Sequence, residues 1–214
     1  TNNKALKAEV FYENWRYKDR LLRKNESNQN SYKWAAPKGL STKKDEIYFN
    51  GDQIWFYHRN TEETVFDATV AQQGLEEIKS QIYNPLKNLI FGGVVEAKGF
   101  KTAGTSEDIY TSTDYKAWKL ESEKPLKKAS LKIKLHTEQT PDLAKWKTSL
   151  TKNITSNEVE NKKWWSDFWN RSFIHIDSKN DSKAGEISRN YQLFRYMLGC
   201  NAYGDYPTKF NGGL

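Results

Sequence analysis

Three histidines are the first residues in this sequence that could do chemistry, because imidazole binds metals and transfers protons near neutral pH. They are His58, His136 and His175. No two of them stand at the spacing of a metal site, and each lies in or at the end of a predicted strand. We interpret all three as structural, partly buried imidazoles. The one cysteine, Cys200, stands in an apolar stretch that predicts a buried, unreactive thiol. We therefore expect no metal and no cofactor.

Neighbouring acidic residues are the second candidates, since glycosidases use two carboxylates held a fixed distance apart. The adjacent pairs fall on polar helix faces or in loops, where carboxylates are normally solvated; they are Glu62-Glu63, Glu76-Glu77 and Glu107-Asp108. The sequence also lacks a Gly-x-Ser-x-Gly elbow and a phosphate-binding glycine loop. We assign no catalytic residue to this chain.

A polar run at residues 57–60 could bind a ligand. It reads Tyr57-His58-Arg59-Asn60 and lies at the end of a predicted strand, where ligands often meet a scaffold. An ordinary hydrogen-bonded turn accounts for the same residues. The sequence leaves both interpretations open.

A tryptophan-rich helix is a further candidate, with Trp164, Trp165 and Trp169 on neighbouring turns. Indole rings could form a stacking platform for flat sugar faces. Rings at this helical spacing also serve packing between domains. We favour packing for these three residues.

The net charge of +7 suggests nucleic acid as a partner, since a basic surface attracts phosphates. The lysines are spread along the chain, however, and often alternate with apolar residues, as in residues 131–135. That alternation predicts a strand with one wet face rather than a concentrated basic patch. We therefore predict no nucleic-acid partner. No apolar run approaches the roughly 18 residues that cross a bilayer, so we also predict no membrane span.

Residues 5–123 predict mostly β-structure with one inserted helix. Asn50-Gly51 predicts a hairpin turn, and Gly92-Gly93 a bulge or a close approach of backbones. Asp67 is the expected N-cap of the helix, whose apolar face continues to Ile82. The predicted fold is mainly β, an antiparallel sandwich with one wet face on each sheet. The expected strands are residues 7–12, 46–49, 54–58, 89–97, 115–120 and 129–136.

Helical patterns replace the strands after His136. A helix start at residues 140–142 has a cap, a proline and an acid, and Leu143, Trp146 and Leu150 then share one face. A second helix is expected to begin near Asn157. The last helix, residues 186–203, carries an apolar stripe; it consists of Ile187, Tyr191, Phe194 and Leu198.

The apolar stripe of the last helix has no partner in the sequence that follows it. We interpret this helix as the opening of a second domain that the chain contains only in part; the alternative is that it packs back onto the sandwich. We expect three parts: a β-sandwich domain (1–138), a helical linker (139–176) and the start of a truncated helical barrel (177–214).

Three segments resemble a known family. They are residues 164–172, with the tryptophans; residues 190–198, with Tyr191-Gln192 and Arg195-Tyr196; and residues 206–212, with Pro207 and Gly212. Together they resemble the junction in six-hairpin glycosidases, most of all the α-L-fucosidase type of glycoside hydrolase family 95. In that family a Tyr-Gln-x-x-Arg-Tyr helix precedes a Pro-x-x-Leu-Gln-Gly loop, in which Phe210 and Asn211 stand here for Leu-Gln. Residues 57–60, 84–86 and 91–93 resemble an uncharacterised sandwich found ahead of such barrels in gut bacteria.

The resemblance implies a β-supersandwich, a helical linker and the first helix of an (α/α)6 toroid. It implies a secreted or periplasmic enzyme that hydrolyses a carbohydrate substrate, usually with inversion, through two carboxylates of the C-terminal barrel that is missing here. In that family the segment that corresponds to Asn211, Lys209 and Tyr206 borders the sugar site. Loops of the sandwich can also reach the opening of the barrel at that site, so Arg59 and Asn60 are further candidates for substrate contact. The alternative function is a stand-alone, non-catalytic carbohydrate-binding or scaffold module.

Overall fold

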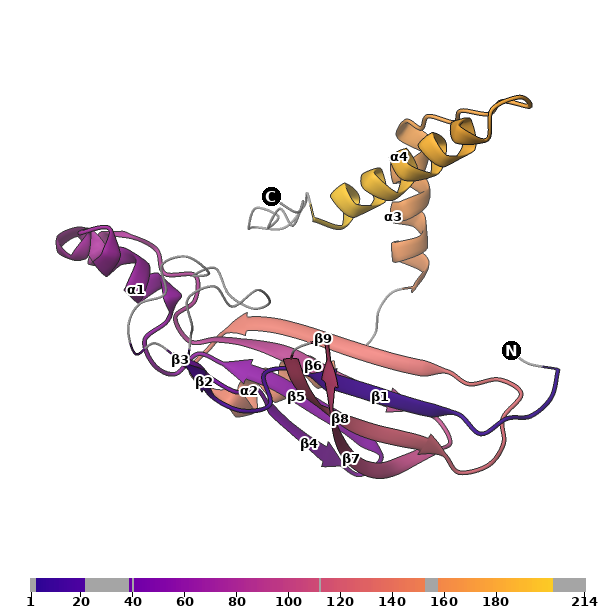
Figure 1. The fold of residues 1–214 in the computed structure, drawn as a ribbon. Helices are drawn as coiled ribbons and strands as arrows, with labels where there is room; N and C mark the ends of the chain where they lie inside the picture. The colour runs from indigo at the N-terminus through magenta and orange to yellow at the C-terminus, as the bar shows by residue number, and fades with distance from the viewer. Residues whose placement is uncertain (1–2, 22–38, 40, 112, 153–157, 202–214) are drawn as a thin grey trace. The chain divides into compact units, whose positions relative to one another are not determined.

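A computed structural model describes residues 3–21, 39, 41–111, 113–152 and 158–201 (Figure 1). It divides into two compact units, Thr1–Ile154 and Thr155–Leu214. The first unit is built mainly from antiparallel strands, and the second contains helices. The mainly β, sandwich-like fold predicted from the alternating strands is confirmed. The boundary between the units lies after residue 154, so the first helix of the predicted linker is part of the β unit.

Two antiparallel sheets make up most of the first unit (Figure 1). The three-stranded sheet has the order β1-β8-β7, and the four-stranded sheet has the order β4-β5-β6-β9. A third, two-stranded sheet pairs β2 with β3. The strands are β1 (Glu9–Asn14), β2 (Arg20–Leu21), β3 (Ser41–Thr42), β4 (Glu46–Asn50), β5 (Gln53–Arg59), β6 (Leu89–Ala97), β7 (Phe100–Tyr110), β8 (Thr113–Ser122) and β9 (Leu131–Gln139).

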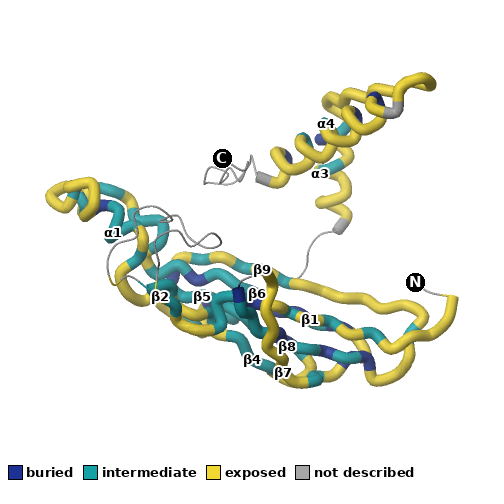
Figure 2. Tube along the Cα trace, viewed as in Figure 1, coloured by how far each residue is buried: buried dark blue, intermediate teal, exposed yellow. Residues whose placement is uncertain are grey.

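The inner faces of the two larger sheets enclose the main hydrophobic core. Ile54 of the four-stranded sheet and Leu120 of the three-stranded sheet are fully buried in it. Tyr12 of β1 stacks on Phe56 of β5, with ring centroids 4.3 Å apart. Exposed and more buried residues alternate along β1 (Figure 2), as expected where one face of a strand meets the core and the other meets water.

Helix α2 (Leu143–Lys152) packs on the other face of the four-stranded sheet. Trp146 and Leu150 are fully buried there, against a group that includes Trp55, Ile90 and Val94. The apolar face predicted for this helix is therefore confirmed. Burial of two large side chains at ~2 kcal/mol each ties the helix firmly to the sheet.

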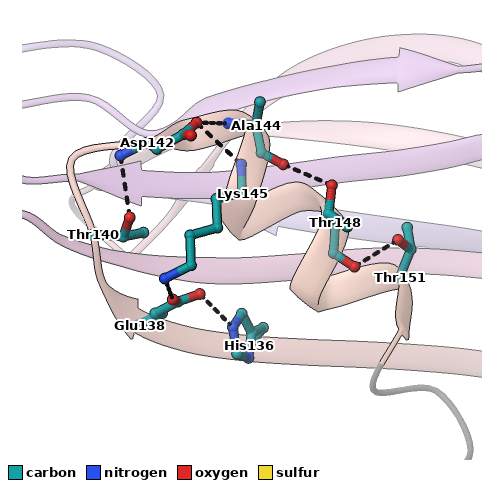
Figure 3. Close-up of polar contacts among 8 residues, drawn as sticks. All are labelled: His136, Glu138, Thr140, Asp142, Ala144, Lys145, Thr148 and Thr151. Atoms are coloured by element: carbon teal, nitrogen blue, oxygen red, sulfur yellow. Dashed lines mark hydrogen bonds and ion pairs between the residues drawn. The ribbon is translucent and has the colours of Figure 1, made fainter.

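Short-range hydrogen bonds fix the start of α2 (Figure 3). Oδ1 of Asp142 accepts from the backbone N–H of Ala144 at 2.8 Å and of Lys145 at 3.1 Å and so caps the helix. The expected order, with the cap at Thr140 and Asp142 inside the first turn, is wrong, because α2 begins at Leu143. The Lys145 ammonium also reaches the carboxylate of Glu138 in β9 at 2.7 Å. The same carboxylate lies 3.2 Å from Nε2 of His136. These polar contacts link the first turn of the helix to the strand before it.

Gly92 in β6 leaves no room for a side chain. A Cβ atom there would lie 2.1 Å from the backbone oxygen of Phe56, and the register with both neighbouring strands runs without a shift. Of the two alternatives predicted for the glycine pair, the close approach of backbones is correct. Gly92 pairs with Tyr57 on one side and His136 on the other, and the ring of Trp146 lies 5.7 Å and 6.1 Å from their rings.

The connection between β5 and β6 holds helix α1 (Val65–Gln72) and the short 3-10 helix η1 (Glu76–Gln81). The expectation that Asp67 is the N-cap is wrong. Thr64 is the N-cap, and the carboxylate of Asp67 accepts from its backbone N–H at 2.8 Å in a capping box. The helix also ends earlier than Ile82, because Gly74 adopts a left-handed φ of 65°.

Strand β7 was not predicted, because most of its 11 residues are polar. It pairs with β8 along its length, with a register shift between Thr102 and Thr105. Gly104 stands in this bulge with a φ of 84°, a conformation that favours glycine. As an edge strand with many exposed side chains, β7 depends on the backbone ladder of β8 rather than on its own apolar residues.

The second unit pairs α3 (Glu158–Arg171) with α4 (Ser182–Asn201). The ring of Trp165 lies 4.9 Å from that of Tyr196, and a Cβ at Gly199 would lie 3.0 Å from the Phe168 ring. Nη2 of Arg195 donates to the Phe168 carbonyl at 2.9 Å. Trp165 and Phe168 of α3 therefore pack against α4, in agreement with the packing interpretation for Trp165, whereas Trp164 is 38% exposed.

Much of the apolar stripe predicted on α4 is exposed among the described residues. Ile187, Phe194 and Leu198 are 55%, 53% and 45% exposed. The expectation that Cys200 is buried is wrong, since its side chain is exposed. The reason is its position one residue beyond Gly199, which is the residue of this turn that faces α3.

Candidate functional site

Three aromatic rings gather at one end of the three-stranded sheet. Trp15 follows β1, Tyr115 lies in β8, and Tyr110 is the last residue of β7. The ring of Trp15 lies 5.4 Å from that of Tyr115, at an interplanar angle of 38°. It lies 6.4 Å from the ring of Tyr110, at 78°. We call these three residues the Trp15 platform.

The strand register places the platform on the outer face of the sheet. In β8, Trp118 and Leu120 point into the core, so Tyr115, an odd number of residues away, points outward. Tyr110 is 65% exposed, while Trp15 and Tyr115 are half-buried. The platform is therefore a set of ring surfaces that solvent and ligands can reach.

Two carboxylates flank the platform. Glu13 stands two residues before Trp15, so β1 carries it on the outer face, and Asp108 lies directly opposite Tyr115 in the β7–β8 ladder. Burial, followed by the negative charges of Glu13 and Asp108, raises the pKa of Tyr115. The site thus combines apolar ring surfaces with oxygen acceptors, a combination typical of sites for small polar ligands.

Asp45, just before β4, holds both neighbours of Trp15. Its carboxylate accepts from Nδ2 of Asn14 at 2.8 Å and forms an ion pair of 2.7 Å with Arg16. Nδ1 of His58 lies 2.9 Å from the same carboxylate, and the His58 and Asp45 side chains are only 11% and 10% exposed. Burial opposes ionisation, but the hydrogen bond from His58, the charge of Arg16 and the hydrogen bond from Asn14 together lower the pKa of Asp45.

Asp114 holds the segment that follows Trp15. Its carboxylate accepts from the Tyr17 hydroxyl and from Nη2 of Arg20, each at 2.8 Å, and also binds the ammonium of Lys18. The hydrogen bonds from Lys18 and then Tyr17 hold the pKa of Asp114 well below its usual range. Trp15 is therefore anchored on both sides, and ordered rings lose less conformational entropy when a ligand binds.

Residues 1–174 of the 214 match the N-terminal model of a family described as Domain of unknown function (DUF5703). The chain belongs to this family. The matched stretch includes the whole Trp15 platform and its anchors. A search of curated proteins and a search of solved structures found no match. The DUF5703 description names no activity, so a function has to be inferred from the geometry of the site.

Arg59 and Asn60 have structural partners in the DUF5703 chain. Nη2 of Arg59 donates to the carbonyl of Pro141 at 2.5 Å, and Nδ2 of Asn60 donates to the carbonyl of Leu86 at 2.8 Å. These bonds hold the end of β5 to the segment before α2 and to the end of the β5–β6 connection. They give both side chains a structural role, but residues 57–59 belong to strand β5, so the hydrogen-bonded turn that was one interpretation of residues 57–60 is wrong. A role for Arg59 and Asn60 at a sugar site stays a prediction.

The other candidate residues predicted from the DUF5703 sequence, Asn211, Lys209 and Tyr206, lie outside the described residues. Their contact with a substrate stays a prediction. In the part of the chain that the structure describes, no three His, Cys, Asp or Glu side chains are grouped so as to hold a metal ion. Within the same ranges, no helix is both long enough and apolar enough to cross a membrane.

Sequence reasoning missed the Trp15 platform in this DUF5703 chain. The first strand was expected to end at residue 12, and β7 was not expected at all. A signal was nevertheless present, because Glu9, Phe11, Glu13 and Trp15 alternate acidic and aromatic side chains with a period of two. That pattern predicts a strand face of rings and carboxylates. Tyr110 and Tyr115 could not be added, since their position beside Trp15 depends on strand pairing.

Proposed function

We propose that this DUF5703 domain binds saccharides at the Trp15 platform, as the non-catalytic N-terminal region of a glycoside hydrolase. The observation that carries the proposal is the group of three rings on the outer sheet face, with Trp15 anchored on both sides and Glu13 and Asp108 flanking the group. The C–H face of a pyranose ring is apolar and can stack on an aromatic ring, while its hydroxyl groups can donate to carboxylates. An outer sheet face that carries several rings suits a chain of several sugar units.

The resemblance of residues 164–172 and 190–198 to the junction of six-hairpin glycosidases supports the enzyme context. In that context the catalytic carboxylates belong to a barrel that follows this region, and the chain contributes substrate contacts only. A secreted or periplasmic location is part of the same proposal, because polysaccharides are degraded outside the cytoplasm. A stand-alone, non-catalytic carbohydrate-binding module is the alternative, and the platform would serve it in the same way.

Calorimetric titration of the 214-residue chain with a panel of soluble oligosaccharides tests the binding proposal. We expect at least one saccharide to bind, and Tyr110→Ala to weaken that binding about fivefold, since a stacked ring contributes ~1 kcal/mol. Tyr83→Ala is the matched control, because Tyr83 and Tyr110 are both 65% exposed and only Tyr110 is in the platform. Trp15→Ala should weaken binding more, because Trp15 contacts both other rings.

Two results would contradict the proposal. One is the absence of saccharide binding across the panel by a wild-type chain whose far-ultraviolet spectrum shows folded strands. The other is an equal loss of affinity in Tyr110→Ala and Tyr83→Ala, which would place the binding surface elsewhere.

A further inference from the structure

Within the described residues, no cation lies over the rings of the Trp15 platform, in contrast to many other aromatic rings of the same unit. A Lys or Arg side chain lies 5.0–5.9 Å from the ring centres of Phe11, Tyr17, Tyr48, Tyr57, Phe91 and Trp118. For Trp15, Tyr110 and Tyr115 no such contact occurs among the described residues. The chain has a net charge of +7, so a shortage of Lys and Arg side chains does not explain why these three rings have no cation over them.

The cations nearest to the platform in sequence are engaged elsewhere. Arg16 pairs with Asp45 and lies over the Phe91 ring at 5.4 Å. Lys116, next to Tyr115, pairs with Glu107 at 3.3 Å and lies over the ring of Trp118. Lys18 binds Asp114 and lies over the ring of Tyr17. The negative faces of the platform rings are therefore left available to a positive group from a ligand.

The outer face of the three-stranded sheet also holds two carboxylates that form no ion pair with any described residue. Strand register places six charged residues on this face, and four of them form two ion pairs: Lys119 with Glu9 at 3.0 Å, and Lys101 with Glu121 at 3.4 Å. The other two are Glu13 and Asp108, which have no ion pair within the described part of the chain. Both flank Tyr115. Burial is the main cause of the raised pKa of Tyr115, and the negative charges of Glu13 and Asp108 are the second. The platform thus has a local charge of −2 on a chain of net charge +7.

We infer that the Trp15 platform selects saccharides that carry a protonated amine, such as glucosamine units, over neutral saccharides. This inference rests on the proposed function and names its ligand class. The sugar ring would stack on the aromatic surfaces, while its ammonium group would lie over a ring face and near Glu13 or Asp108. Aromatic rings combined with carboxylates are a chemically suitable site for an ammonium group, because ring quadrupole and carboxylate both attract it.

Three β-1,4-linked hexasaccharides of equal length test the inference: glucosamine, N-acetylglucosamine and glucose hexamers. At a pH below the pKa of the glucosamine amine, we expect the glucosamine hexamer to bind about tenfold more tightly than the other two, because a ring face and a carboxylate both attract its ammonium group. The double variant Glu13→Gln/Asp108→Asn should weaken binding of the glucosamine hexamer more than binding of the neutral hexamers, and so lower the preference to about threefold, the part that the rings would keep. Glu9→Gln is the matched control, because Glu9 lies on the same face and already pairs with Lys119.

The outcomes separate the inference from the proposed function. Equal affinity for all three hexamers, or a preference that is undiminished in the double variant, overturns the amine selectivity and leaves saccharide binding intact. Failure of all three hexamers to bind counts against both. A lysine hexapeptide is included as a fourth ligand, and binding as tight as that of the glucosamine hexamer would overturn the inference, since it would show attraction to charge alone. Loss of the preference as salt is raised agrees with an exposed ion contact.

Discussion

Arg16 forms an ion pair of 2.7 Å with Asp45, and the backbone N–H of Asp45 donates to the carbonyl of Arg16 at 2.7 Å. This double contact crosses between the segment after β1 and the segment before β4. It fixes the backbone immediately beside Trp15, on the opposite side from Asn14, which binds the same carboxylate. The fixed position of Trp15 in the platform therefore depends on Asp45, which is 30 positions later in the sequence.

Replacement of Asp45 by alanine is expected to destabilise the chain by about 3 kcal/mol. The change leaves the half-buried Arg16 without its counter-ion and the nearly buried His58 without its hydrogen-bond partner. The free energy of unfolding from urea denaturation measures the effect. Asp19→Ala is the control, because its ion pair with Lys43 is exposed and should contribute less than about 1 kcal/mol. Similar losses in the two variants would contradict an anchoring role for Asp45.

The contribution of Asp45 to stability should depend on pH. Its pKa is lowered in the folded state, so the stabilisation is fully present above the unfolded value of about 4 and is lost as the pH falls through the folded value. The difference in unfolding free energy between wild type and Asp45→Asn should therefore be largest near neutral pH and shrink as the pH falls below about 4. Urea denaturation across this range measures it. A difference that stays constant down to the lowest accessible pH would be inconsistent with an ionised, paired Asp45.

A methyl group at Gly92 should be poorly tolerated. Gly92→Ala would place a Cβ atom 2.1 Å from the backbone oxygen of Phe56, so β5 and β6 would have to separate. We expect a loss of about 2 kcal/mol or more, as for other overpacked sites. Gly185→Ala in α4 is the matched control, since nothing lies within 4 Å of its added Cβ and alanine favours a helix by ~1 kcal/mol. Thermal unfolding that ranks Gly92→Ala as no worse than Gly185→Ala would disprove the close packing of these strands.

Backbone amides of α4 should exchange with solvent faster than those of β6. The helix leaves apolar side chains such as Phe194 exposed, whereas β6 pairs on both sides and contributes Ile90 and Val94 to the buried core. Few buried contacts make local opening easier. Hydrogen exchange followed by mass spectrometry of residues 186–201 and 89–97 provides the comparison. Equal protection in the two segments would show that α4 is stabilised by contacts as extensive as those of the sheet.

The chain by itself should not hydrolyse aryl glycosides. The proposal places the catalytic acid and base carboxylates in a following barrel and gives Glu13 and Asp108 of the platform a binding role only. The expected rate for the purified chain equals that of buffer. Turnover that persists through several purification steps and is lost in Glu13→Gln or Asp108→Asn would show that these two carboxylates catalyse as well as bind.

The predictions from sequence were most accurate where periodic burial determines the structure. The strand at residues 89–97 has the predicted bounds, and the face of α2 that carries Trp146 and Leu150 is buried as expected. Both elements place apolar side chains on a face at their own period, and that face must meet a core. Prediction failed where hydrogen bonds of local polar side chains, or pairing with another strand, determine the bounds of an element. Asp67 is an acid at a helix start, as N-caps often are, but it is the third helical residue of a capping box that begins at Thr64, and β7 has too few apolar residues to be recognised.

What the sequence alone determined is the class of fold: antiparallel strands with one wet face, followed by helices. Alternation and helical spacing are local properties, so they can be read without knowing which segments meet. The Trp15 platform was decided only by the tertiary structure, because its three rings come from positions 15, 110 and 115. They meet through the pairing of β1 and β7 with β8 and through the anchoring of Arg16 by Asp45. Register and long-range ion pairs are properties of the folded chain, and no pattern within one segment encodes them.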